Sequence, residues 1–173
     1  MKRFILTIFV VFCISVVSAE TLQPAFDFTL SNLEGDDVTL SDVYSQKIVI
    51  LDFWGINCGP CRAALPHLQE IENHFGSENV QVLAVTSDSK RLERKVKSFI
   101  KSKKFEFTVL MDYNGDVARL YNVQAIPQTF IINTDGQIIE HTVGYRAGEE
   151  KHIFDIVKKA TDALTENAQP ENE

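Results

Sequence analysis

A pair of cysteines at the junction of a buried strand and an amphipathic helix constrains the fold of this chain more than any other feature. Residues 48–53 form a nearly continuous apolar run, which predicts a central strand covered on both faces. In residues 61–75 apolar side chains recur at helical spacing, and Gly76 can end that helix. Cys58-Gly-Pro-Cys61 lies between the two elements, so Cys58 is expected at the helix N-terminus.

The remaining apolar patterns alternate between strand and helix periods, which predicts one mixed α/β domain over residues 20–164. We expect a central mixed β-sheet flanked by helices, with its parallel part joined by right-handed crossovers. Strands are expected at 80–86, 107–111, 129–132 and 137–143, an N-terminal hairpin at 26–30 and 38–40, and further helices around 92–100, 116–121 and 153–160. The polar ending, residues 165–173, is predicted to be a disordered tail.

The first nineteen residues have the pattern of a signal peptide. Lys2 and Arg3 precede an apolar run, residues 4–17, and small residues end at Ala19, where cleavage is expected. A membrane-spanning helix needs about 20 apolar residues, so an uncleaved anchor is the weaker alternative. The segment predicts a periplasmic or otherwise extracytoplasmic protein.

Charge and cysteine content narrow the functional classes. Without residues 1–19 the chain has 15 basic and 24 acidic residues, and this net charge of −9 disfavours nucleic acid and anionic lipid as partners. Loss of Cys13 with the signal leaves only Cys58 and Cys61, which can form one disulfide in an oxidising compartment. We expect a monomer without a cofactor or a metal.

The position of the pair predicts thiol chemistry. At a helix N-terminus, unpaired amide groups and the helix dipole favour a thiolate, which is the form that attacks disulfides. Cys58 is therefore the candidate nucleophile, and Cys61, one turn further on, would displace the partner from it. Pro60 suits the first helical turn and Gly59 permits close approach of a substrate.

Three alternatives compete with this hypothesis. A zinc site needs two more ligands, and His67 and His74 are seven residues apart instead of the usual four to six. A purely structural bridge would close too short a loop to restrain the unfolded chain much. A binding domain that retains both cysteines without redox activity is not excluded by the sequence.

Two segments together resemble the thioredoxin superfamily: Leu51-Asp-Phe-Trp-Gly-Ile-Asn-Cys-Gly-Pro-Cys61, and Ile126-Pro127-Gln-Thr-Phe-Ile-Ile132. The N-terminal hairpin, the additional strand and helix between Val80 and Lys103, and the export signal are similar to its TlpA and ResA branch. The resemblance covers residues 24–162. It implies a thioredoxin-like fold with a central β-α insertion, and thiol-disulfide exchange as the activity.

The resemblance also implies a substrate surface. Pro127 would follow a cis peptide bond and face the cysteines, and the Ile126-Pro127 turn would present backbone groups to an extended client segment. An ordinary proline at the start of a strand is the alternative. Trp54 is expected to cover the site, with a purely core position as the alternative.

Asp52 lies six residues before Cys58, as the corresponding acid does in thioredoxins. Burial without a charged partner would raise its pKa, which makes it a candidate to take the proton from Cys61. A carboxylate that is only hydrogen-bonded at the strand end is the alternative.

Two positions depart from the branch. Asn57 replaces the usual tryptophan before the first cysteine, which makes the expected substrate surface more polar. Ala64 replaces an acid found three residues after the second cysteine, which puts a role in cytochrome c maturation in doubt. Exchange chemistry needs neither residue.

The leading hypothesis is a reductase of disulfides in client proteins that serves redox homeostasis and is rearmed by a membrane or periplasmic thiol donor. Gly59-Pro60 between the cysteines resembles the reducing thioredoxins. One alternative is peroxide reduction, because peroxiredoxin-like folds share the hairpin and the inserted helix, although their Pro-x-x-x-Thr-x-x-Cys pattern is absent before Cys58. The other is a non-catalytic module that holds clients on the Pro127 surface.

Overall fold

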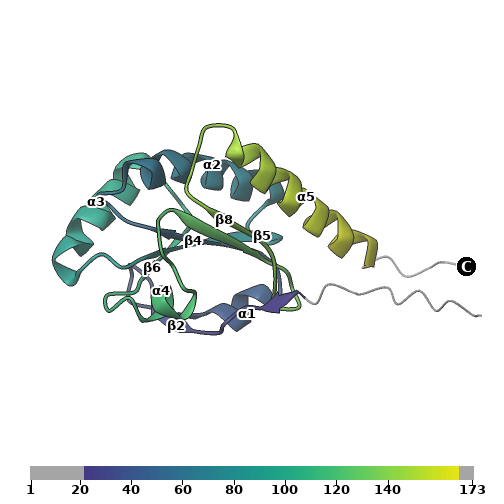
Figure 1. Cartoon of the computed structure of the whole chain (residues 1–173), viewed down its shortest axis with the longest axis horizontal. Helices are drawn as coiled ribbons and strands as arrows, with labels where there is room; N and C mark the ends of the chain where they lie inside the picture. Colours follow the sequence, from purple (N-terminus) through teal and green to yellow (C-terminus); the bar gives the residue numbers. More distant parts are fainter. Residues whose placement is uncertain (1–21, 168–173) are drawn as a thin grey trace, which may run out of the picture.

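The computed structural model describes residues 22–167, which form a six-stranded mixed sheet between two layers of helices (Figure 1). The strand order is β1-β8-β7-β4-β5-β6. β4, β5 and β6 are parallel, whereas β7 and β8 are antiparallel to their neighbours. The strand bounds are Gln23–Pro24 for β1, Ile48–Trp54 for β4, Val80–Thr86 for β5, Thr108–Met111 for β6, Gln128–Ile132 for β7 and Gln137–Val143 for β8.

Strand β4 is buried along its whole length and contributes to both cores. Ile48, Ile50 and Trp54 belong to the core under α2 (Gly59–Phe75), α3 (Glu93–Lys103) and α5 (Glu149–Asn167). The alternate side chains belong to the other core, which α1 (Leu40–Tyr44) and α4 (Asp116–Leu120) help to cover. Side chains alternate along a strand, so Asp52 faces the same layer as Ile50 and Trp54, on the side of α2.

The expected N-terminal hairpin is present as a separate two-stranded sheet of β2 (Thr29–Ser31) and β3 (Asp37–Thr39). A bridge between Asn32 and Leu110 of β6 joins it to the edge of the main sheet. Its second strand is as long as expected but lies one residue earlier, because Leu40 begins α1 instead of ending β3. Neither α1 nor β1 was expected from the sequence.

The thioredoxin-like fold class is confirmed, including the central insertion, in which β5 is followed by the 3-10 turn η1 (Lys90–Leu92) and α3. Helix α5 continues to Asn167, so the domain boundary expected at residue 164 falls inside a helix. The predicted signal segment and residues 168–173 of the predicted tail lie outside the described residues. Among residues 22–167, no helix combines the length and apolar character needed to cross a membrane.

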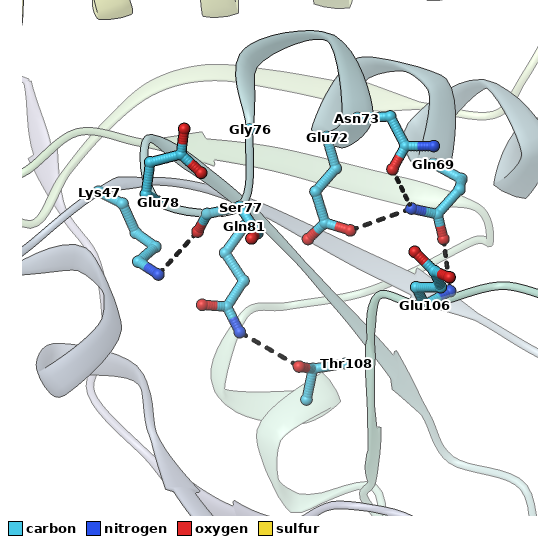
Figure 2. Close-up of a pocket in the computed structure, with 10 residues that line it drawn as sticks. All are labelled: Lys47, Gln69, Glu72, Asn73, Gly76, Ser77, Glu78, Gln81, Glu106 and Thr108. Atoms are coloured by element: carbon cyan, nitrogen blue, oxygen red, sulfur yellow. Dashed lines mark hydrogen bonds between the residues drawn. The ribbon is translucent and has the colours of Figure 1, made fainter.

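A polar cavity of about 700 Å³ lies beside the amino ends of β4 and β5, whereas the cysteine pair follows the carboxyl end of β4 (Figure 2). Two side chains of α2 at this cavity accept hydrogen bonds from backbone N–H groups that lie just before the paired residues of β5 and β6. Gln69 accepts hydrogen bonds from the backbone N–H groups of Glu106 and Phe107, at 2.6 and 3.2 Å, and Glu72 accepts one from Val82 at 2.9 Å. These contacts give both polar residues a role in holding the sheet.

Candidate functional site

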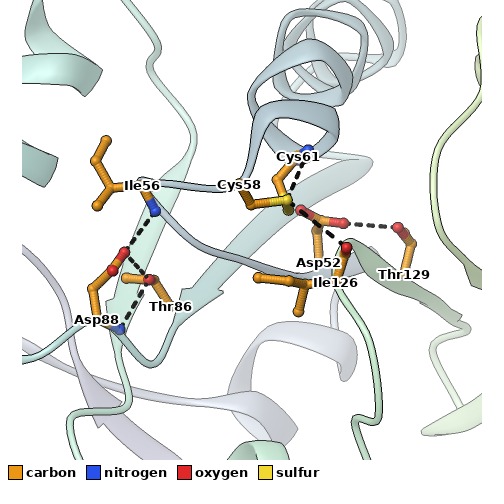
Figure 3. The surroundings of a disulfide bond; sticks show 8 residues. All are labelled: Asp52, Ile56, Cys58, Cys61, Thr86, Asp88, Ile126 and Thr129. Atoms are coloured by element: carbon orange, nitrogen blue, oxygen red, sulfur yellow. Dashed lines mark hydrogen bonds between the residues drawn. A yellow bond between two sulfur atoms is a disulfide. The ribbon is translucent and has the colours of Figure 1, made fainter.

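Cys58 is the N-cap residue of α2, and its sulfur is joined to that of Cys61 in a disulfide with an S–S distance of 2.07 Å (Figure 3). The Cys58 Sγ accepts a hydrogen bond from the Cys61 backbone N–H at 3.1 Å. Cys58 is half-buried, Cys61 is fully buried, and Gly59 and Pro60 between them are exposed. The structure therefore brings the predicted pair together with one sulfur accessible and the other enclosed.

This arrangement gives the two sulfurs different chemistry once the bridge is reduced. A hydrogen bond from a backbone N–H and the positive end of the helix dipole both stabilise negative charge on Cys58. Cys61 lies inside the first turn, where apolar packing surrounds it. Cys58 can thus react with an external disulfide, while Cys61 can reach only a group attached to Cys58.

The loop before β7 forms the second wall of the site. Its Ile126-Pro127 peptide bond is cis, and the Ile126 carbonyl oxygen lies 3.8 Å from the Cys58 Sγ. Pro127 is buried, and its carbonyl accepts a hydrogen bond from the Gly144 N–H at 2.7 Å. The Ile126 side chain is 41% exposed, so this residue, and not the proline ring, presents a surface to solvent beside Cys58.

Asp52 lies beneath the cysteines with its side chain directed toward them (Figure 3). It is fully buried, and its Oδ1 accepts a hydrogen bond from the Thr129 hydroxyl at 2.7 Å. Its Oδ2 has no hydrogen-bond partner among the residues the structure describes. Burial raises the pKa of Asp52 from 3.8 to about 7, an effect that the Thr129 hydrogen bond only partly offsets. Such a carboxyl can exchange a proton near neutral pH.

Trp54 does not cover the site. Only 2% of it is exposed, and its ring lies 6.0 Å from the Phe99 ring of α3, in the core below the helical layer. The expected contact between Trp54 and a substrate is therefore wrong, and the core alternative holds. The physical reason is that α3 packs over this end of β4 and encloses the indole.

Asp88 is a site residue that the sequence analysis missed. Its Oδ2 accepts hydrogen bonds from the Ile56 N–H and from the Thr86 hydroxyl, both at 2.7 Å. It thereby holds the loop that leads from β4 into Cys58. Asp88 follows the carboxyl end of β5, which adjoins that of β4, so strand adjacency was the signal that could have identified it.

The histidines weighed for a zinc site lie elsewhere. His67 stacks on Tyr145 with the ring centroids 6.0 Å apart, and His74 packs against Phe75 and Phe154. Within the described part of the chain there is no group of three or more metal-ligating side chains.

Comparisons with known proteins agree with this geometry. The model of the AhpC/TSA family matches residues 21–141. The thiol-disulfide oxidoreductase ResA of Bacillus thuringiensis subsp. konkukian is 30% identical over 139 residues, which are 80% of this chain and 78% of that protein. A crystal structure from Chlorobium tepidum, provisionally named the thiol:disulfide interchange protein DsbE, matches with a TM-score of 0.75 and 32% identity, over 83% of this chain and 99% of that chain. The exposed lipoprotein thioredoxin Etrx1 of Streptococcus pneumoniae matches with a TM-score of 0.65 and 29% identity, over 78% and 99% of the two chains.

Proposed function

Because this chain belongs to the AhpC/TSA family and is a ResA-like thiol-disulfide oxidoreductase, we propose that it reduces disulfides of client proteins outside the cytoplasm. The observation that carries the proposal is the asymmetry of the two cysteines. Cys58 is half-buried and its sulfur accepts a hydrogen bond from the Cys61 backbone N–H, whereas Cys61 has no exposed surface. That asymmetry separates a sulfur that attacks from a sulfur that resolves.

The reaction begins from the dithiol form. The Cys58 thiolate attacks one sulfur of the client disulfide, a mixed disulfide forms, and the other client sulfur leaves as a thiolate that takes up a proton. Asp52 accepts the proton of the Cys61 thiol, and the resulting thiolate attacks the Cys58 sulfur. The second client sulfur leaves as a thiolate and takes up the proton that Asp52 accepted, so the client gains two electrons and two protons while the Cys58–Cys61 disulfide forms.

The client is proposed to bind across the groups that surround the Cys58 sulfur. Ile126 offers an exposed apolar side chain and, 3.8 Å from that sulfur, a carbonyl that can accept a hydrogen bond from an extended segment. Gly59 and Pro60 add an exposed, narrow surface at the start of α2. Pro127 supports this surface from below through its bond to Gly144.

The cellular setting is also part of the proposal. The signal pattern of residues 1–19 supports a periplasmic or otherwise extracytoplasmic location, and the similarity to a pneumococcal protein named an exposed lipoprotein agrees with it. In an oxidising compartment the enzyme needs a membrane or periplasmic thiol donor to restore the dithiol. It would act there as a monomer that maintains redox homeostasis.

A trapping experiment tests the exchange mechanism. In Cys61→Ala, the mixed disulfide on Cys58 cannot be resolved, so client proteins should remain attached and separate as larger species on non-reducing gels. The double variant Cys58→Ser with Cys61→Ala is the matched control and should trap nothing. Equal capture by both variants, or no capture by either, would contradict catalysis through Cys58 and favour a binding module.

The direction of transfer is tested by equilibration with glutathione buffers. A reductase should have a potential below about −200 mV, whereas a clearly higher value would identify an oxidant or isomerase. In a parallel assay, peroxide and insulin are each mixed with the dithiol form of the protein, and their reduction is measured. Rapid peroxide consumption without insulin reduction would replace the proposal with the peroxidase alternative.

A further inference from the structure

The positive charge of this acidic protein is concentrated on one segment. Residues 90–104, which form η1, α3 and the residue after it, contain eight of the 17 basic residues and one of the 24 acidic residues. The segment therefore carries a formal charge of +7, whereas the rest of the chain carries −14. This segment belongs to the insertion that follows β5.

One side chain of this segment reaches the active-site loop. The Lys95 Nζ donates a hydrogen bond to the Asn57 Oδ1 at 2.7 Å, and Asn57 directly precedes Cys58. Both Lys95 and Asn57 are exposed, so the ammonium group remains accessible to a bound client.

Lys95 is one of six basic residues of this segment that have no carboxylate partner within residues 22–167, whereas the other two are paired. Lys90 and Lys97 both pair with Glu93, at 2.7 and 3.0 Å. Within residues 22–167 no carboxylate lies within 4 Å of the Lys95 ammonium; Asp88, the acid that holds Ile56, also lies beyond that distance. Lys95 thus holds a positive charge without a carboxylate partner against the side chain of Asn57, the residue that precedes the nucleophile.

We propose that Lys95 determines specificity by favouring client disulfides that are flanked by Asp or Glu. The inference rests on the proposed reductase function and adds a substrate class to it. The Ile126 carbonyl contacts the Cys58 sulfur, and Asn57, which holds Lys95, directly precedes Cys58, so a client segment that contacts Ile126 can extend an acidic residue toward the ammonium group. Charges at the rim of an interface act mainly on the association rate, and salt weakens their effect by screening.

The test uses three synthetic disulfide peptides that differ only in the residue beside the reactive cysteine: Glu, Lys or Gly. The ratio of kcat/KM for the Glu peptide to that for the Lys peptide is measured at low salt and at about 0.5 M salt, where exposed charges are screened. Wild-type protein should prefer the Glu peptide by about two- to fivefold at low salt, which is within the range expected of exposed ion pairs. High salt should remove most of this preference.

Variants separate the role of Lys95 from a general effect of charge. Lys95→Gln should bring the ratio close to one, and Lys95→Glu should reverse it. Lys101→Glu makes the same charge change on an exposed residue of α3 that is not bonded to Asn57, and it should keep the wild-type ratio. Thermal unfolding of each variant checks that the fold is intact.

Each failure has a distinct meaning. A Lys95→Glu ratio equal to that of wild type, or an equal loss in Lys101→Glu, overturns the assignment of Lys95 while the reductase function stands. Absence of turnover of all three peptides by wild-type protein overturns the proposed function itself.

Discussion

Replacement of Asp52 by Asn should stabilise the protein, and the gain should depend on pH. Asp52 is fully buried, one of its oxygens lacks a partner among the described residues, and burial raises its pKa from 3.8 to about 7. Asn keeps an acceptor for the Thr129 hydroxyl, which donates to Oδ1 at 2.7 Å, but never carries charge. The substitution therefore removes the cost of burying a carboxylate.

The magnitude follows from the pKa difference between the native and unfolded states. Below pH 3.8 both states are protonated and the variant gains little. Between 3.8 and about 7 the unfolded chain releases the proton while the native carboxyl keeps it, so wild-type stability falls as pH rises, by about 1.4 kcal/mol per pH unit. The advantage of the variant should be about 2 kcal/mol at pH 5 and should level off at about 4 kcal/mol above pH 7.

Guanidinium unfolding of the disulfide form at pH 5 and pH 8 measures both values. At pH 8 the midpoint of the variant should lie about 1 M above that of wild type. Asp155→Asn, which removes an exposed carboxylate of α5, is the control for charge alone and should show no such pH dependence. Equal stability of wild type and Asp52→Asn at pH 8, or an advantage that does not shrink at pH 5, would refute the burial argument.

Three further outcomes are expected. In Asp52→Asn, release of the client from the mixed disulfide should slow by about 10²-fold at pH 7 because Cys61 loses its proton acceptor, and an unchanged single-turnover rate would remove Asp52 from the mechanism. Asp88→Ala should lower the free energy of unfolding by about 1–3 kcal/mol because the Ile56 N–H loses its acceptor, and turnover of a neutral peptide should fall as well; calorimetry and kinetics check the two effects. Trp54→Ala should cost about 3–5 kcal/mol in denaturant unfolding because it leaves a cavity in the core. If Trp54→Ala instead bound clients more weakly at unchanged stability, Trp54 would contact the substrate and the core assignment would be contradicted.

Elements with long apolar patterns could be predicted from the sequence, whereas short elements could not. The expected range for β5, residues 80–86, coincides with the observed strand, because seven residues packed between two layers leave a strong signal. Helix α1 has five residues with only Leu40 buried, and β1 has two residues whose pairing depends on β8. Such elements are defined by their tertiary neighbours, which a local pattern does not contain.

The site was predictable to the extent that its residues form a motif. Cys58, Cys61 and the cis peptide bond before Pro127 lie in the two segments by which the sequence resembles the thioredoxin superfamily. The error at Trp54 arose because every residue of β4 is buried, so the pattern does not distinguish a side chain below the site from one that covers it. Asp88 accepts its hydrogen bond from Ile56, which is 32 residues away in the sequence. A contact between two single residues so far apart leaves no sequence motif.

The edges of the main sheet have a consequence for a protein that handles extended polypeptides. One edge is β1, which spans two residues, one of them Pro24 with no N–H to donate, and the other is β6, which the Asn32 bridge of the hairpin partly occupies. β1 pairs with only Gln137 and Ile138 of β8, so within residues 22–167 the rest of β8 has no strand partner on that side. An extended client chain that reached this part of β8 could therefore add a strand there, whereas β1 and the bridged part of β6 offer it little backbone.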